Sequence, residues 1–598
     1  MLKISQSNQV KYFLFYYRRL KWRIPVLLVL SAFLAFFDGI GIALFVPLFQ
    51  IAETGDSSGS ALGSLDFVVD FLNNIGIELT IANIMIFIVV LFSFKAVINY
   101  LSKYYLTKIR VDFMRAERTH LIDGICNVSY SGFVNIDHGR VQNVITAEMN
   151  KAVWAFTSFF SALQAAVMLI GYMSLAFVTN FQFALLITVA GVLSNVIFRI
   201  INKKVEIASL YQSIIGNGLQ AKILESVWNY KYLKATDLVS KYRTKLVKLT
   251  NDTEDLSMKM GKFNALSYSI REPILMFFIC GIIFIEVYYF HVSITSIAFS
   301  LMLFMRSLTN LMTMQTNWQA FLMNSGSLHL VGELNAELHN KVETDVQEDI
   351  ADFNDSLTFD HVTFSYAPNL PNVLNDINLT IKKNQTVAFV GESGSGKTTI
   401  VNMLAGLLLP NGGALKVDNV PLTSSKVKSF RKNIGYITQE PVVLNDSVFN
   451  NITFFDEKND KNLKRLNITL EKTALTSMVE GLSQKEDTLL GDNGVLISGG
   501  QKQRISIARE LYRDCSLLLM DEATSALDTE NELIIQSNIN DLKGKYTIII
   551  IAHRLSTIRN ADVIYLLDNG KIEASGNFEE LQKKSPKFKK MVDLQDFS

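Results

Sequence analysis

The chain has 598 residues, of which 49% are hydrophobic and 19% are charged, and its formal net charge is +1. This length allows more than one domain, and a high apolar share with few charges is typical of a protein that crosses a membrane. The near-neutral charge excludes the basic footprint of a nucleic-acid-binding protein. The 3 cysteines are odd in number and far apart, so they predict neither a disulfide framework nor a cysteine-bound metal.

The first half of the chain holds apolar stretches that are long enough to span a bilayer. We expect six spanning helices, at about Ile24–Phe49, Ile81–Leu101, Ala155–Val178, Phe181–Ile201, Pro273–Tyr289 and Ile294–Met312. The basic residues before the first stretch should stay in the cytoplasm by the positive-inside rule. The polar segments 102–154 and 202–270 are rich in Lys and Arg, which predicts that the spanning helices continue into the cytoplasm.

The segment 51–79 contains several acidic residues and neither Lys nor Arg, as expected of an external loop. Within it, residues 65–75 place polar side chains on one helical face and apolar side chains on the other. This pattern predicts a short helix on the outer membrane surface, and a loop helix packed on the protein would show the same pattern.

The pattern of the chain changes again towards its second half. From about residue 357 short strands alternate with short helices and glycine turns, and the segment before it turns acidic. We therefore predict a transmembrane domain over 1–325, a linker over 326–356 and an α/β domain over 357–598.

A glycine-rich loop over 391–398 reads G-x-x-x-x-G-K-[ST] and lies between an apolar strand pattern and a helix pattern. Such a loop points its backbone N–H groups and a helix N-terminus at phosphates. Lys397 would reach the β- and γ-phosphates of ATP, and Thr398 would ligand Mg²⁺. The remaining residues expected in the cradle are Gly391, Ser393, Gly394, Ser395, Gly396 and Thr399.

Two carboxylates follow the apolar run 517–520, which predicts a buried strand. Asp521 would hold Mg²⁺, and Glu522 would act as general base by polarising the attacking water. The alternative is that both carboxylates only stabilise a helix N-terminus.

The sequence Ile497-Ser498-Gly499-Gly500-Gln501 is similar to the signature of ABC transporter ATPases, with Ile in place of the usual Leu. Further motifs of that family follow in its order. By this resemblance Tyr366 stacks on adenine, Gln439 senses the metal, Asp528 belongs to a loop that crosses to the other subunit, and His553 is the switch on the γ-phosphate. The alternative for His553 is a structural role, which is more common for a single histidine. In the loop before the signature, Asp492 stands where the family commonly has Glu.

The resemblance implies that Ser498, Gly499, Gly500 and Gln501 close over the ATP of a second copy of the chain. The fold it implies is an α-helical six-span membrane domain followed by an α/β P-loop ABC nucleotide-binding domain, which is an exporter-type half-transporter. Intact motifs favour a homodimer over a heterodimer. Short coupling helices are expected near Tyr130–Asn135 and Glu225–Tyr230, where hydrophobic helix packing is the alternative.

Ionisable residues within spans are costly and usually functional. Asp38, Lys95, Glu286 and Arg306 fall within expected spans. Lys95 and Arg306 would contact a phosphate-rich substrate, with Asp38 nearby, or Asp38 and Lys95 would form a structural ion pair.

The stretch 31–47, the acidic external segment and the basic residues within the spans resemble bacterial lipid-linked oligosaccharide flippases. The function implied is ATP-driven transport of an amphipathic lipid across the bacterial cytoplasmic membrane, with the ATPase domain and both termini inside. A multidrug or antimicrobial-peptide exporter is the alternative, and a non-transporting ABC channel or regulator is a third class.

Overall fold

The computed structural model describes residues 9–45, 48, 80–179, 181–288, 294–343, 348–349, 353–367, 369–521, 537, 540–551 and 558–595. The chain divides into two compact units. The membrane unit comprises Met1–Val128 and Asn135–Lys341, and the ATPase unit comprises Ser129–Val134 and Val342–Ser598. The predicted outer helix over 65–75, together with Glu522, Asp528 and His553, lies outside the described residues.

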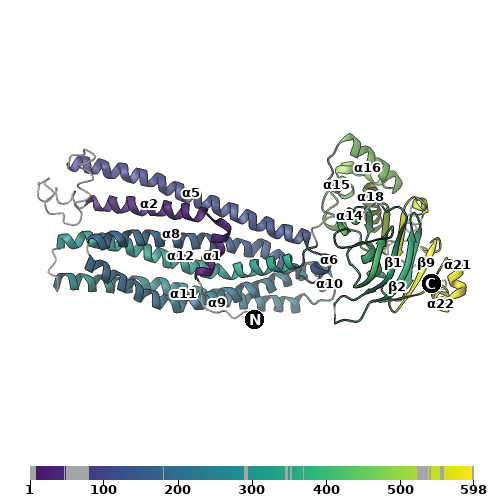
Figure 1. Cartoon of the computed structure of the whole chain (residues 1–598), viewed down its shortest axis with the longest axis horizontal. Helices are drawn as coiled ribbons and strands as arrows, with labels where there is room; N and C mark the ends of the chain where they lie inside the picture. The colour runs from purple at the N-terminus through teal and green to yellow at the C-terminus, as the bar shows by residue number, and fades with distance from the viewer. Residues whose placement is uncertain are drawn as a thin grey trace. The chain divides into compact units, whose positions relative to one another are not determined.

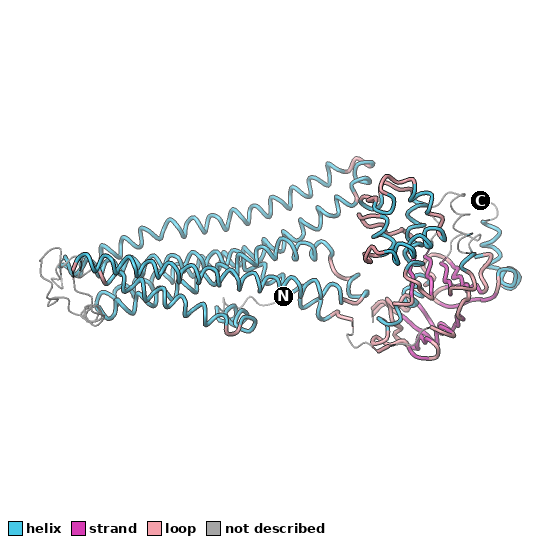
Figure 2. The backbone as a smooth tube through the Cα atoms, turned by 90° about the horizontal axis from the view of Figure 1, so that it is seen from above, coloured by secondary structure: helices cyan, strands magenta, loops and turns pink. Residues whose placement is uncertain are grey.

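The membrane unit is built from long helices that run alongside one another (Figures 1 and 2). Its elements are α1 (Gln9–Leu20), α2 (Arg23–Ala43), α5 (Ile81–Asn127), α7 (His138–Asn143), the π-helical turn η2 (Val144–Glu148), α8 (Met149–Thr179), α9 (Phe181–Trp228), α10 (Tyr230–Ala235), α11 (Val239–Tyr288) and α12 (Ile294–Asn340).

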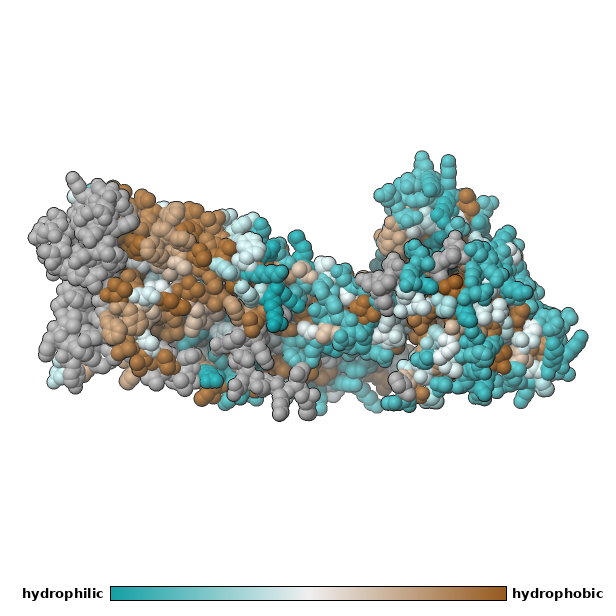
Figure 3. Space-filling view, in the orientation of Figure 1, coloured by the Kyte–Doolittle hydropathy of each residue, from teal (hydrophilic) through white to brown (hydrophobic). Residues whose placement is uncertain are grey.

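Apolar side chains cover one part of the surface of this unit, as expected of a protein that faces lipid (Figure 3). Within the described residues, the helical stretches Arg23–Ala43, Ile81–Asn127 and His138–Val178 are long and apolar enough to cross a membrane. The other predicted spans fall in α9, α11 and α12. The count of six spans stays a prediction.

Several helices continue far beyond their apolar parts. At a rise of about 1.5 Å per residue, the 47 residues of α5 extend about 70 Å, which is twice the thickness of a bilayer's hydrocarbon core. The first expected coupling helix coincides with α6 (Tyr130–Val134), which belongs to the ATPase unit. The second short helix, α10, begins only at Tyr230, because α9 remains helical as far as Trp228.

Close packing in the membrane unit relies on small residues. A Cβ atom added to Gly171 of α8 would lie 2.7 Å from the Cβ of Ala35 in α2, and one added to Gly326 of α12 would lie 2.6 Å from the carbonyl oxygen of Ser209 in α9. Glycine therefore lets these backbones approach closely, which is the usual basis of helix association in lipid. Further along the helices, a buried aromatic cluster around Tyr16 packs α1 against α8.

The ATPase unit contains two sheets, with strand orders β10-β9-β3-β8-β7-β6 and β2-β1-β4-β5. In the first sheet the strands β3, β6, β7, β8 and β9 pair in parallel, and β10 pairs antiparallel with β9. All pairs in the second sheet are antiparallel. The strands are β1 (Ser356–Phe364), β2 (Leu374–Lys382), β3 (Thr386–Gly391), β4 (Gly412–Val417), β5 (Val420–Pro421), β6 (Ile434–Ile437), β7 (Leu517–Asp521), β8 (Thr547–Ile551), β9 (Val563–Asp568) and β10 (Lys571–Gly576).

The central strands β3 and β8 are buried along their whole length, which explains why their sequences are apolar without alternation. The helices of this unit are α13 (Lys397–Leu404), α14 (Val427–Arg431), α15 (Val448–Thr453), α16 (Asp460–Lys472), α17 (Thr476–Glu480), α18 (Gly499–Tyr512), α21 (Phe578–Lys584) and α22 (Pro586–Gln595), with 3₁₀ turns at Lys485–Asp487 and Asp492–Gly494. The described strands and helices form the α/β architecture that the sequence predicts.

Candidate functional site

The glycine-rich loop joins the end of β3 to the start of α13, in the context that the motif requires. Gly391 has φ +152°, and a Cβ there would lie 2.3 Å from the carbonyl oxygen of Leu567 in β9. Gly396, the residue before α13, has φ +103°, and a Cβ there would lie 2.7 Å from Leu374. Gly391 therefore requires glycine for backbone conformation and for space, and Gly396 requires it for its positive φ.

Lys397 is buried and folds back over this loop. Its Nζ donates to the carbonyl oxygens of Gly391 at 2.8 Å and Glu392 at 2.9 Å. These bonds hold the ammonium group beside the cradle. Ser395 is also buried, and its hydroxyl has no hydrogen-bond partner among the described residues. A phosphate group fits this arrangement, because its oxygens would satisfy the hydroxyl and pair with the ammonium.

The metal-binding residues predicted by sequence come from neighbouring parts of the same sheet. Thr398 lies at the start of α13 and is exposed, and Asp521 ends β7, paired in register with Ile551 of β8. Since β3, β8 and β7 are parallel neighbours, their carboxyl ends meet at one edge, where ligands bind in such sheets. Burial and the nearby charge of Asp521 raise the pKa of Tyr436 to about 12, so this phenol stays neutral beside the carboxylate.

The adenine-stacking residue predicted by the family resemblance, Tyr366, has 56% of its surface exposed. Its hydroxyl lies 3.2 Å from Oγ1 of Thr399, and its ring packs edge-on against Phe364 at 5.1 Å between centroids. The ring is thus tied to the first turn of α13 and still open to a ligand. Gln439, which follows β6, is exposed as well.

The signature residues form a helix start. Ser498 caps α18: its hydroxyl accepts from the amide of Gln501 at 3.3 Å, while the Gln501 side chain accepts from the amide of Ser498 at 2.8 Å. Ser498 and Gly499 are exposed. The helix packs on α15, α16 and β6, whereas α13 packs on β3, β7 and β8. The signature therefore presents an exposed, capped helix N-terminus that is supported by different elements from those that hold the phosphate loop.

Sequence reasoning missed the side chain that anchors this helix. Arg509 is buried in α18, where Nε donates to the carbonyl oxygen of Asn451 at 2.7 Å and Nη2 to that of Val442 at 2.9 Å. Asn451 is fully buried and bonds the same segment. The only signal in the sequence is a charged residue on the apolar side of the helical pattern, next to Ala508.

The charged residues predicted within the spans differ in their surroundings. Asp38 of α2 is 1% exposed and forms an ion pair with Lys95 of α5, and it also accepts from the hydroxyl of Tyr172 in α8. The ammonium group of Lys95 lies 5.0 Å from the centre of the Phe92 ring. Arg306 of α12 is exposed. The structural ion pair considered for Asp38 and Lys95 is present, and substrate contact by Lys95 or Arg306 stays a prediction.

Comparisons with known proteins agree with this architecture. The family model described as ABC transporter matches residues 374–525, and the one described as ABC transporter transmembrane region matches residues 26–316. A solved structure of a bacterial Atm1-family ABC exporter with ATP bound superposes with a TM-score of 0.78, at 21% identity, over 96% of this chain and 98% of that chain.

Curated relatives align over most of this chain. The ATP-dependent lipid A-core flippase of Haemophilus influenzae is 29% identical over 532 residues, which cover 86% of this chain and 88% of the relative. That of Idiomarina loihiensis is 28% identical over 505 residues, with 83% and 85% covered. That of Sodalis glossinidius is 38% identical over 310 residues, with 51% of each chain covered. With a helical membrane domain and an ATP-hydrolysing domain in one polypeptide, this chain belongs to the ABC transporters and is an exporter-type half-transporter.

Proposed function

We propose that two copies of this chain form an ATP-driven flippase that moves an amphipathic lipid, such as a lipid-linked oligosaccharide, across the bacterial cytoplasmic membrane by alternating access. The observation that carries this proposal is that the similarity to lipid A-core flippases covers 86% of the chain and so includes the membrane domain. The membrane domain is the part that selects cargo, since ABC ATPase domains are shared by transporters of many substrates.

Within this proposal the described residues supply binding and orientation. Lys397 and the loop amides hold the phosphates, Tyr366 supports the base, and Thr398, Gln439 and Asp521 hold Mg²⁺, which neutralises charge on the phosphates. The signature of the second copy closes the site with its helix N-terminus, residues 498–501. ATP then joins the two ATPase domains, and hydrolysis releases them.

Three further assignments belong to the same proposal. Glu522 acts as general base on the attacking water, His553 contacts the γ-phosphate, and Asp528 lies in the loop that crosses to the second copy. Their support is the match of sequence motifs around them.

The competing function is export of drugs or small antimicrobial peptides, which uses the same ATPase. To separate the two, the ATPase rate is measured in lipid nanodiscs, with Glu522→Gln as the blank. Polyprenyl-linked and lipid A-type lipids are compared with a panel of water-soluble peptides and drugs. We expect stimulation by the lipids and none by the soluble panel; stimulation by the soluble panel alone would reject the flippase proposal.

A further inference from the structure

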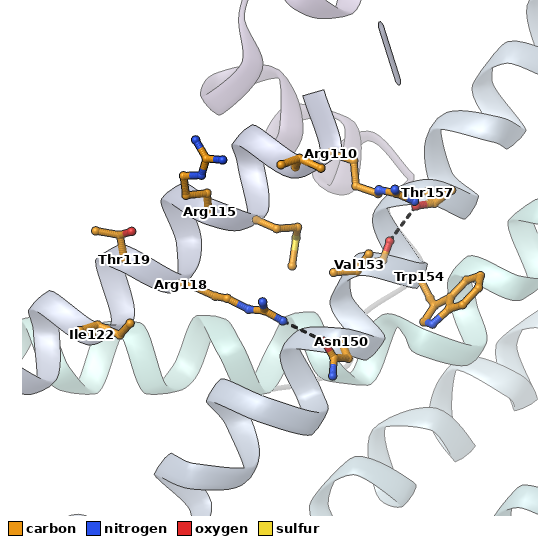
Figure 4. A pocket seen from close by; sticks show the side chains of 11 residues that line it. Arg110, Arg115, Arg118, Thr119, Ile122, Asn150, Val153, Trp154 and Thr157 are labelled. Atoms are coloured by element: carbon orange, nitrogen blue, oxygen red, sulfur yellow. Dashed lines mark hydrogen bonds between the residues drawn. The ribbon is translucent and has the colours of Figure 1, made fainter. Parts of the chain in front are cut away.

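A groove of about 740 Å³ lies between α5 and α8 in the membrane unit (Figure 4). Three arginines of α5 line it, Arg110, Arg115 and Arg118, and α8 contributes Asn150 and Trp154. The volume falls within the range of small-molecule sites. Arg118 donates to Oδ1 of Asn150 at 2.8 Å, which joins the two walls at one end of the groove.

Within the part of the chain that the structure describes, no carboxylate neutralises the positive charge of the groove. Among the described residues, Arg110 and Arg115 have no ion-pair or hydrogen-bond partner, and none of the residues that line the groove is acidic. Two of the three carboxylates of α5 pair elsewhere, Asp112 with Arg23 at 3.1 Å and Glu117 with Arg19, and the third, Asp123, does not line the groove.

The guanidinium groups of Arg110 and Arg118 reach from α5 towards α8, and that of Arg115 lies further out along the same groove (Figure 4). Guanidinium groups suit phosphate because their planar donors bind two oxygens at once. Neutral hydrogen-bonding partners on α8 complete a site for a polar ligand. The charge of the groove therefore favours an anion and selects against a neutral peptide or drug.

The position of the groove relates it to the membrane surface. Trp154 is 66% exposed and directly precedes the apolar part of α8, as expected of a residue at the lipid–water boundary. Arg118 lies about 12 Å further along α5 than Arg110, at 1.5 Å per residue. On α8 the groove thus begins at the boundary, whereas on α5 Arg110 lies about 14 Å beyond the expected end of the span at Leu101. From there the groove extends away from the bilayer, on the side that the Lys- and Arg-rich helix extensions predict to be cytoplasmic.

We propose that the α5–α8 groove binds the phosphate groups on the headgroup of the transported lipid while its acyl chains are still in the cytoplasmic leaflet. This inference rests on the proposed lipid flippase function and names a loading site for it. A compact phospholipid headgroup reaches only the membrane end of the groove. A large phosphorylated glycan headgroup extends along it to Arg115 and Arg118.

The test uses the full-length protein in phosphatidylcholine nanodiscs that contain increasing fractions of a bis-phosphorylated disaccharide lipid. The variant Arg110→Gln/Arg115→Gln/Arg118→Gln is expected to elute as a dimer like the wild type, which checks that it folds. It should need more than tenfold more of this lipid for half-maximal stimulation, since the loss of even one charge-assisted hydrogen bond costs about tenfold in affinity. Arg115→Gln alone should show a smaller shift in the same direction without loss of packing.

A matched control removes the same charge from an exposed part of α11: Lys241→Gln/Arg243→Gln/Lys248→Gln should leave the lipid response unchanged. Dephosphorylated lipid should stimulate the wild type and the groove variant equally. An unchanged lipid response of the groove variant overturns the loading site and leaves the flippase function standing. If no lipid stimulates the wild type, both the loading site and the flippase function are overturned. A groove variant that elutes as a monomer where the wild type is a dimer would assign the groove to a second copy instead.

Discussion

Lys397 makes two hydrogen bonds to carbonyl oxygens of its own loop, so its ammonium group is already placed beside the cradle. We predict that Lys397→Ala weakens ATP binding at least tenfold, because a hydrogen bond to a charged group contributes about 1.5–3 kcal/mol. Binding of a fluorescent ATP analogue measures this, and Lys464→Ala, at an exposed position of α16, is the control. Equal affinity in both variants would contradict the assignment of Lys397 to the phosphates.

The buried charge of Asp38 depends on partners from two other helices. We predict that Lys95→Met lowers the Tm by about 5 °C or more, because removing one partner leaves a carboxylate buried without its counterion. Asp38→Asn/Lys95→Met should cost less than Lys95→Met alone, since no charge is then left unpaired. Thermal unfolding in detergent measures both effects.

A different result for Lys95→Met would assign Lys95 to substrate binding instead of to the ion pair. If Lys95→Met kept the wild-type Tm and lost only the stimulation of ATPase by lipid, Lys95 would be a substrate contact. The sequence alone identified Asp38 and Lys95 as a possible pair. It could not identify Tyr172 as the third member, because Tyr172 lies 134 residues after Asp38 and only the packing of α8 on α2 brings them together.

At the scale of the element, helices α2 and α8 approach closely at Gly171 and Ala35. We predict that Gly171→Ala destabilises the protein by about 1–3 kcal/mol, because the added Cβ would lie 2.7 Å from that of Ala35 and the helices must move apart. Gly171→Ala/Ala35→Gly should recover most of the loss, because it removes the atom that clashes. The measurement is the Tm of the detergent-purified protein.

The control for this prediction is Gly281→Ala in α11, where a Cβ would meet no described atom within 4 Å. Alanine at that position should be neutral or slightly stabilising, since it raises helix propensity. A loss in Gly171→Ala that Ala35→Gly does not recover would show that the cost arises elsewhere than in this helix crossing.

The limits of sequence reasoning are clearest at this scale. The phosphate loop could be predicted because strand, loop and helix are contiguous. The strands that pair with β3 could not be predicted. They are β8 and β9, which come more than 150 residues later in the chain, and their pairing depends on the whole sheet. The sequence predicts the second coupling helix near Glu225–Tyr230, whereas α9 continues to Trp228 and the next short helix, α10, begins at Tyr230. Nothing in the local pattern before Asn229 interrupts a helix, and α9 therefore continues.

At the scale of the whole molecule, one chain carries one phosphate loop and one signature, held by different elements. In the proposed homodimer each ATP lies between the loop of one copy and the signature of the other. Ser393 and Ser498 are both exposed, so cysteines at these positions can report the arrangement. The native Cys126, Cys280 and Cys515 are first replaced by serine or alanine, because two of them are exposed.

One chain then carries Ser393→Cys, a second chain with another tag carries Ser498→Cys, and both carry Glu522→Gln so that bound ATP persists. We predict that mixed dimers treated with a short bis-maleimide give a band of twice the chain mass, and that ATP increases its amount, because the two sites approach only when the ATPase domains close. Dimers of either variant alone are the control and should give no such band. If a single chain carrying both cysteines were linked only within itself, the site would be complete in one copy, and the two-copy mechanism would have to be abandoned.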